Sequence, residues 1–192
     1  MALTHAWLRP PRGRLARAVA VVLMIAVETV PLAGAQADEV QLRAALTVNF
    51  AKFITWPHEA FGSETAPFRV AVVSDDVLAA ALEKIARGRS VGGRPITVFR
   101  AVPADDLGQM HLVFLGNLDD RRVTVILDNL RGKPVLTVAE RAGFTRHGGM
   151  IGIVLADETM RFEVNEKALK GASLQANAAM MSLAIGAGKH GR

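Results

Sequence analysis

The chain has 192 residues, a formal net charge of +5 at pH 7 and no cysteine, which excludes disulfide bonds, thiol nucleophiles and cysteine-ligated metals. The first 37 residues hold four arginines and one glutamate, so residues 38–192 carry a net charge of +2. Their basic residues are scattered and few aromatic residues lie among them, which argues against a nucleic-acid-binding protein.

The first 37 residues have the pattern of a secretory signal peptide. Four arginines between positions 9 and 17 precede the apolar run 18–27, and Ala35-Gln36-Ala37 supplies small residues for cleavage. A membrane anchor is the alternative, but a spanning helix needs about twenty apolar residues and Glu28 interrupts this run. We therefore predict export of a mature chain that starts at Asp38.

A first helix is predicted over 38–56, because Pro57 stops it and its large apolar residues recur at steps of three and four. We expect one shared face made of Leu42, Leu46, Asn49, Phe50, Phe53 and Trp56. Its aromatic residues could form an exposed docking ridge, but aromatic residues at helical spacing more often fill a core. We therefore expect them to pin the helix to a sheet.

The middle of the chain alternates buried strands with amphipathic helices. The predicted order is strand 68–74, helix 77–87, strand 96–101, strand 112–115, a helix from Asp119 to just before Gly132, and strand 134–138. A strand, helix and strand at this spacing predict parallel pairing with a right-handed crossover.

The last part of the chain, 148–183, predicts a β-hairpin followed by two short helices. Residues 150–155 are apolar, and 160–164 alternate apolar and charged side chains, as in a strand with one solvated face. Asn165 is a predicted N-cap. The fold class expected is a single α/β domain over 38–185, with a mixed, mostly parallel sheet of about six strands, a C-terminal antiparallel hairpin and helices on the faces. Residues 186–192 are expected to form a flexible tail.

No group of residues in the sequence predicts a catalytic, cofactor or metal site. The histidines of the mature chain lie far apart, and the acidic pairs at 75–76, 105–106 and 119–120 sit where N-caps are expected. The GAGKHG segment, 186–191, matches a dinucleotide-binding pattern, but it does not stand between a strand and a helix here, so we expect no dinucleotide site. We therefore predict a protein that is not an enzyme and has no cofactor.

A ligand crevice is one candidate function, because parallel α/β sheets bind ligands beyond the carboxyl ends of their strands. The candidate crevice residues are Asp75, Asn117, Arg146 and His147. Small-molecule stabilisation of the purified protein would test this hypothesis.

Two segments resemble the YfiR family. The first is NFAKFITWP at 49–57; the second combines GF at 143–144, GGMI at 148–151, RFEVN at 161–165 and the helical stretch 168–183. The resemblance covers essentially all of 38–185. It implies a periplasmic, non-enzymatic regulator that inhibits the sensory domain of an inner-membrane diguanylate cyclase, which lowers cyclic-di-GMP and biofilm formation.

The resemblance also implies a homodimer, and it leaves the membrane partner open. Relatives of the best-known type carry disulfides, which this chain cannot form. The candidate residues for a partner or dimer interface are Leu174, Met180, Met181 and Ile185, although core packing is the alternative for them. The alternative function is a periplasmic small-molecule-binding module that feeds another membrane sensor, and an uncharacterised hydrolase is a third possibility.

Overall fold

The computed structural model describes residues 32–100, 104–156 and 159–186. The described residues from Ala37 onward belong to one compact unit, which holds the sheet. Almost all of the predicted signal peptide and the tail residues 187–192 lie outside the described residues. Among the described residues no helix combines the length and hydrophobicity needed to span a membrane.

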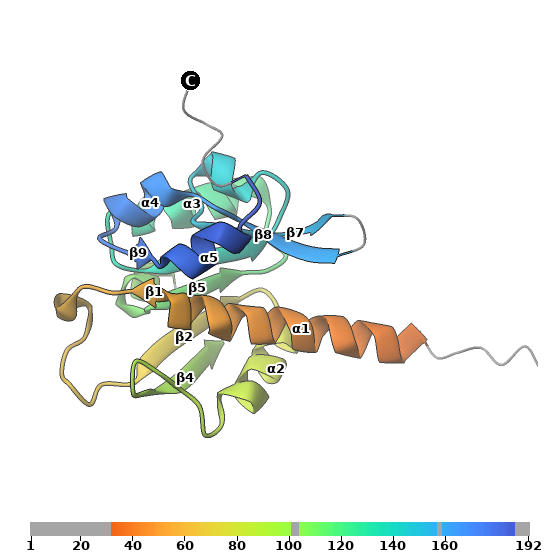
Figure 1. Cartoon of the computed structure of the whole chain (residues 1–192), viewed down its shortest axis with the longest axis horizontal. Helices are drawn as coiled ribbons and strands as arrows, with labels where there is room; N and C mark the ends of the chain where they lie inside the picture. Colours follow the sequence, from red (N-terminus) through yellow and green to blue (C-terminus); the bar gives the residue numbers. More distant parts are fainter. Residues whose placement is uncertain (1–31, 101–103, 157–158, 187–192) are drawn as a thin grey trace, which may run out of the picture. The chain divides into compact units, whose positions relative to one another are not determined.

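A seven-stranded, mostly parallel sheet forms the centre of the fold (Figure 1). Its strands, in spatial order, are β3 (Ser90–Val91), β4 (Arg94–Arg100), β2 (Phe68–Val73), β5 (Leu112–Leu115), β6 (Leu136–Glu140), β7 (Ile151–Ala156) and β8 (Thr159–Val164). The five strands from β4 to β7 are parallel, while β3 and β8 pair antiparallel at the two ends. The predicted fold class is therefore confirmed, and all six predicted strands are present.

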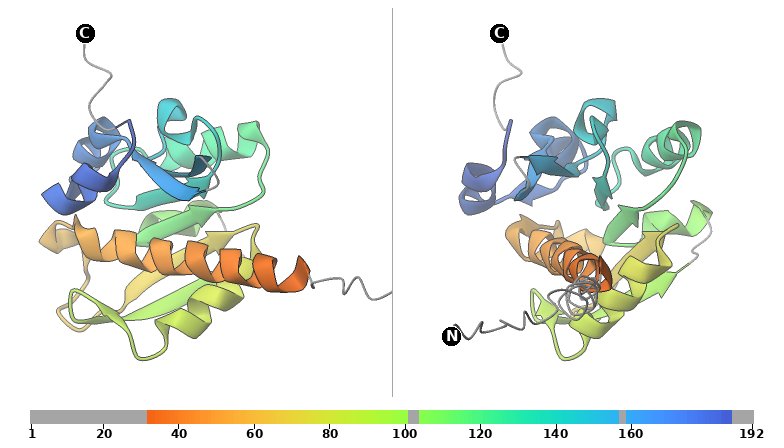
Figure 2. Two further views of the ribbon diagram at one scale, coloured as in Figure 1. Left: turned by 45° about the vertical axis from the view of Figure 1, so that its right-hand side comes forward. Right: turned by 90° about the vertical axis from the view of Figure 1, so that its right-hand side faces the viewer.

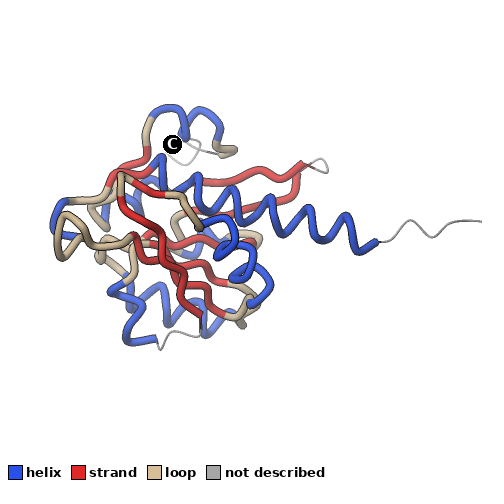
Figure 3. The backbone as a smooth tube through the Cα atoms, turned by 90° about the horizontal axis from the view of Figure 1, so that it is seen from below, coloured by secondary structure: helices blue, strands red, loops and turns tan. Residues whose placement is uncertain are grey.

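Helices cover both faces of the sheet, so the central strands are buried on both sides (Figure 2). Helices α1 (Leu32–Phe53) and α2 (Asp76–Ala86) pack on one face, and α3 (Asp120–Leu130) packs on the other. In β5, Leu112 and Phe114 belong to the first core cluster and Val113 and Leu115 to the second. Figure 3 shows the helices flanking the strands.

Side-chain caps begin the helices where the sequence predicts them. Asp75 caps α2, Asp119 caps α3 and Asn165 caps α4 (Glu166–Gly171), each by accepting a hydrogen bond from the amide three residues ahead. The donor–acceptor distances are 2.8–3.0 Å. The acidic pairs at 75–76 and 119–120 are therefore explained by helix capping.

The predicted buried face of α1 is partly wrong. Leu42 and Phe53 are 48% and 38% exposed and Asn49 is also exposed, while Ala44, Thr47, Val48 and Ala51 are buried. Small side chains therefore make up much of the buried face of this helix. Phe50 is buried against Phe162 of β8, at a ring-centroid distance of 5.0 Å, so the expectation of core packing holds for this residue.

The helix also ends earlier than predicted, because the chain leaves it to form a second, two-stranded sheet. Strand β1 (Ile54–Thr55) follows Phe53 directly and pairs antiparallel with β9 (Gln175–Ala176). After β9 comes α5 (Ala178–Leu183), and Ile185 then bridges to Glu163 of β8. The C-terminal segment is thus attached to both sheets.

The described residues also form three short 3-10 helices. They are η2 (His58–Ala60), η3 (Ala104–Gln109) and η4 (Phe144–His147). Glycines with positive φ flank η4 on both sides, Gly143 at 72° and Gly148 at 97°. These left-handed conformations explain the two glycines, because other residues adopt them at a cost.

Candidate functional site

The order in which the chain adds strands to the sheet reverses between the neighbouring strands β2 and β5: β4 lies on one side of them, and β6 and β7 lie on the other. The helix after β2 packs on one face and the helix after β5 on the other, so the loops after these strands meet at the kind of edge where open α/β sheets bind ligands. These loops carry Asp75 and Asn117, two of the candidate crevice residues. The structure therefore brings these two residues to the same edge of the sheet.

Backbone contacts hold the two loops tightly together at this edge. The Gly116 amide donates to the Val73 carbonyl at 2.8 Å, and the Asn117 amide donates to the Ser74 carbonyl at 3.2 Å. Ser74 has a φ of +58°, a left-handed conformation that is uncommon for serine. A Cβ at Gly116 would lie 2.6 Å from the Ser74 carbonyl oxygen, so this close approach requires glycine.

An arginine from α1 occupies the same edge. The Nη1 atom of Arg43 lies 3.0 Å from Glu140 Oε2, at the end of β6, and 3.5 Å from Asp75 Oδ2. The Arg43 side chain is 17% exposed, and its Nε atom is buried without a hydrogen-bond partner among the described residues. Both carboxylates are thus engaged by one guanidinium, which ties α1 to the sheet.

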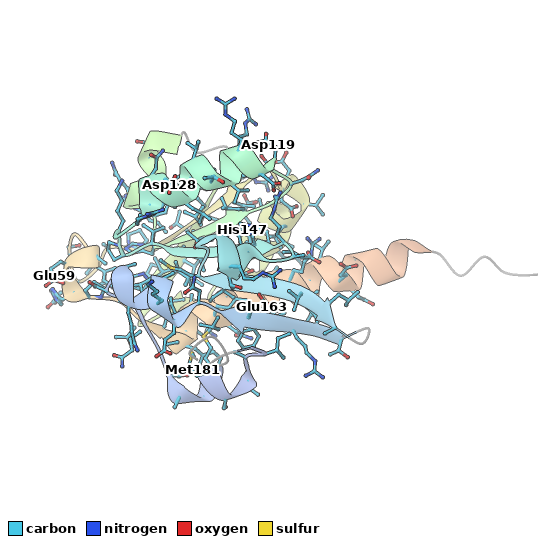
Figure 4. The ribbon with its side chains drawn as sticks, turned by 90° about the horizontal axis from the view of Figure 1, so that it is seen from above. Glu59, Asp119, Asp128, His147, Glu163 and Met181 are labelled. Carbon is cyan, nitrogen blue, oxygen red and sulfur yellow. The ribbon has the colours of Figure 1, made fainter. Side chains whose placement is uncertain are left out.

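His147 does not join this edge. It ends η4, just before β7 begins, and its Nδ1 donates to the Gly143 carbonyl at 2.8 Å. His147 instead lines a cavity with the end of α3 and with α4, which we call the α3–α4 cavity. Figure 4 labels His147 and Asp128, which come from η4 and α3. Arg146 is exposed, and its guanidinium lies against Gly143.

The candidate interface residues of the C-terminal segment fall into two groups by solvent exposure. Leu174 and Met180 are 2% and 1% exposed and belong to the core, so their side chains are not available to a partner. Met181 and Ile185 are half-buried, and the neighbouring Leu183 is 68% exposed. Met181 lies on the opposite side of the sheet from α3 (Figure 4).

A buried histidine that sequence reasoning left unassigned joins three distant segments. His111 is 5% exposed, its Nδ1 accepts from the Arg69 amide at 2.9 Å, and its Nε2 donates to the Ala60 carbonyl at 3.1 Å. Its ring stacks between Phe61 and Phe68, with centroids 4.5 and 5.1 Å away. Burial lowers the pKa of His111. No local pattern predicts this cluster, because His111 lies more than forty residues from its other members.

The described residues contain no group of three histidine, aspartate or glutamate side chains that could hold a metal ion. The polar clusters that are present, around Arg43 and His111, are engaged in internal ion pairs and hydrogen bonds. Their geometry accounts for attachment of loops and of α1 to the sheet.

Residues 40–185 match the model of the protein family described as YfiR/HmsC-like. The matched region contains both sheets and extends from α1 to the Ile185 bridge. It therefore covers nearly all of the predicted domain 38–185.

Proposed function

Because the chain belongs to the YfiR/HmsC-like family, we propose that it is a periplasmic regulator that binds and inhibits the sensory domain of an inner-membrane diguanylate cyclase. The observation that carries this proposal is the family match over residues 40–185. Membership of this family is consistent with a role in cyclic-di-GMP signalling. Inhibition of the cyclase would lower the cellular concentration of cyclic-di-GMP and reduce biofilm formation.

The proposed mechanism is binding without catalysis. A regulator inhibits a two-state sensor by binding its inactive state more tightly than its active state. At saturation the ratio of inactive to active sensor rises by the ratio of the two affinities. The regulator itself then needs a stable surface and no reactive group. The engaged side chains around Arg43 and His111 agree with this role.

We propose that the partner contacts the exposed side of α5, at Met181 and Leu183, together with Ile185, which follows the helix. Leu183 is the most exposed of these side chains, and methionine adapts well to different partner surfaces. The same surface could serve a homodimer. The two uses are separable, because a homodimer persists in the purified protein whereas sensor binding requires the membrane protein.

Co-purification from membranes tests the proposal. The tagged full-length protein is expressed in its native host, and the captured membrane proteins are examined for a sensor with a cytoplasmic cyclase output. We expect Leu183→Glu to abolish this capture and to raise cellular cyclic-di-GMP. The matched control is Leu155→Glu, because Leu155 is 72% exposed on the β7–β8 hairpin.

Capture of no cyclase by the folded wild-type protein would contradict the proposed function. Equal loss of capture in both variants would contradict the assignment to α5 alone. The molar mass of the purified protein in solution, measured for wild type and Leu183→Glu, decides whether α5 also forms the homodimer interface.

A further inference from the structure

The α3–α4 cavity has a volume of about 320 Å³, at the lower end of the range for small-molecule sites. It lies between the last turn of α3, the η4–β7 connection and α4. Its apolar part is formed by Leu127, Leu130, Met150 and Ala168. Leu130 and Met150 are themselves 2% and 5% exposed, so the core supports this part of the wall.

The charged side chains that line this cavity are all basic. Arg131 comes from the end of α3 and Lys167 from α4, and no carboxylate is among the described residues that line the cavity. Lys167 forms no ion pair with another described residue. Arg131 pairs with Asp128, but both side chains are more than half exposed, so this pair contributes little and can be exchanged for a ligand.

The remaining polar groups of the lining are fixed by internal hydrogen bonds. Asn165 uses its Oδ1 to cap α4 and its Nδ2 to bind the Thr145 carbonyl. His147 donates from Nδ1 to the Gly143 carbonyl, which orients the ring and leaves Nε2 as its second hydrogen-bonding atom. The cavity therefore combines an apolar wall with two cationic side chains and one oriented imidazole.

We propose that the α3–α4 cavity binds a small organic monocarboxylate, with its apolar body on Leu127, Leu130 and Met150 and its carboxylate on Lys167 and Arg131. The apolar wall disfavours inorganic anions, and the two cations disfavour neutral or cationic molecules of the same shape. A ligand with about eight non-hydrogen atoms binds such an open site with a Kd on the order of 1 mM.

Hexanoate is a suitable probe, because hexan-1-ol and hexylamine keep its chain and replace its charge. Binding is followed in amide and methyl NMR spectra of the purified mature protein. We expect saturable shifts at His147, Gly148, Leu127 and Leu130 with hexanoate, and none with hexylamine. Hexan-1-ol should bind about tenfold more weakly, since it lacks the charged hydrogen-bond acceptor.

Lys167→Glu tests the charge requirement, and Lys84→Glu is its matched control. Both lysines are exposed on helices, and Lys84, on α2, does not line the cavity. We expect Lys167→Glu to weaken hexanoate binding about tenfold and Lys84→Glu to leave it unchanged. Ala168→Leu, which adds bulk to the cavity wall, should also weaken binding.

The proposal is overturned if hexanoate causes no saturable shift at roughly fifty times the expected Kd, or if its shifts map outside the cavity. Equal binding of hexanoate and hexan-1-ol, or equal effects of the two lysine variants, would also overturn it. These outcomes are independent of the proposed membrane partner, because the purified protein alone is measured.

Discussion

Protonation of His111 is predicted to destabilise the fold as the pH falls. In the folded protein Nδ1 accepts the Arg69 amide hydrogen, and protonation replaces this acceptor by an N–H group. The Arg69 amide then faces a second donor and has lost its acceptor. The hydrogen bond from His111 Nε2 to the Ala60 carbonyl remains. Arg69 and Arg94 both oppose a positive charge on the ring, and burial opposes it most.

The size of the effect follows from the lost hydrogen bond. Leaving a buried donor unsatisfied costs about 1–3 kcal/mol, a large part of the 5–15 kcal/mol by which domains are typically stable. Because burial lowers the pKa of His111 in the folded state, the unfolded state binds this proton more tightly. Neutral His111 therefore stabilises the fold fully above its pKa in the unfolded state, about 6.5. This stabilisation is lost as the pH falls through the lower pKa that His111 has in the folded state.

Urea unfolding monitored by tryptophan fluorescence measures this effect. Trp56 is the one tryptophan of residues 38–192, and it packs edge-on against Phe68 in the same cluster. We expect the free energy of unfolding to fall by about 1–3 kcal/mol between pH 7.5 and pH 4.5 beyond the change in a His111→Asn control. Asparagine can accept the Arg69 hydrogen bond but does not titrate. Parallel pH profiles for the two proteins would refute the reasoning.

Three substitutions test other parts of the fold, each by urea unfolding. Arg43→Ala should cost about 1–3 kcal/mol, because Asp75 and Glu140 lose their shared guanidinium; an unchanged midpoint would mean that solvent replaces it. Gly116→Ala should cost about 1–3 kcal/mol, because its Cβ would meet the Ser74 carbonyl oxygen; no loss would show that the two loops can separate. Met180→Ala should cost about 2–5 kcal/mol, since Met180 is 1% exposed, and a loss below 1 kcal/mol would argue against core packing.

Local sequence patterns were sufficient to predict most of the sheet. Strands β2 and β5 lie between the two core clusters and read as apolar runs, interrupted in β2 by Arg69. The caps Asp75, Asp119 and Asn165 mark helix starts by residue type and spacing. These signals lie within a few residues of one another. They could therefore be read without knowledge of the tertiary structure.

The buried face of α1 shows where that reasoning fails. Assigning the face by large apolar residues favoured Leu42 and Phe53, but the helix buries Ala44 and Ala51 instead. An alanine contributes little to a hydrophobic pattern, although it allows close packing of the backbone. The correct face depends on the space left by the sheet and by Phe162, which local periodicity does not contain.

The sites depend on contacts between distant segments, and this limits prediction further. Asp75 and Asn117 were expected at one sheet edge and do meet there, because each follows a strand of a parallel sheet and the carboxyl ends of such strands share an edge. Arg43 contacts Asp75 at that edge although it lies 32 residues earlier in the sequence. No pattern within its own helix predicts this contact. The same holds for β1 and β9, two-residue strands whose pairing spans more than 100 residues.

The attachment of α5 bears on how a partner could use it. At its start the Asn177 amide donates to the Phe53 carbonyl at 2.9 Å, and beyond its end the Ile185 amide donates to the Phe162 carbonyl at 2.9 Å. Met180 anchors the helix in the core between these points. A partner that displaced α5 would have to break both bonds and expose Met180, at a cost of several kcal/mol. Docking onto Leu183 with α5 in place avoids this cost, so we expect the proposed partner to bind without displacing α5.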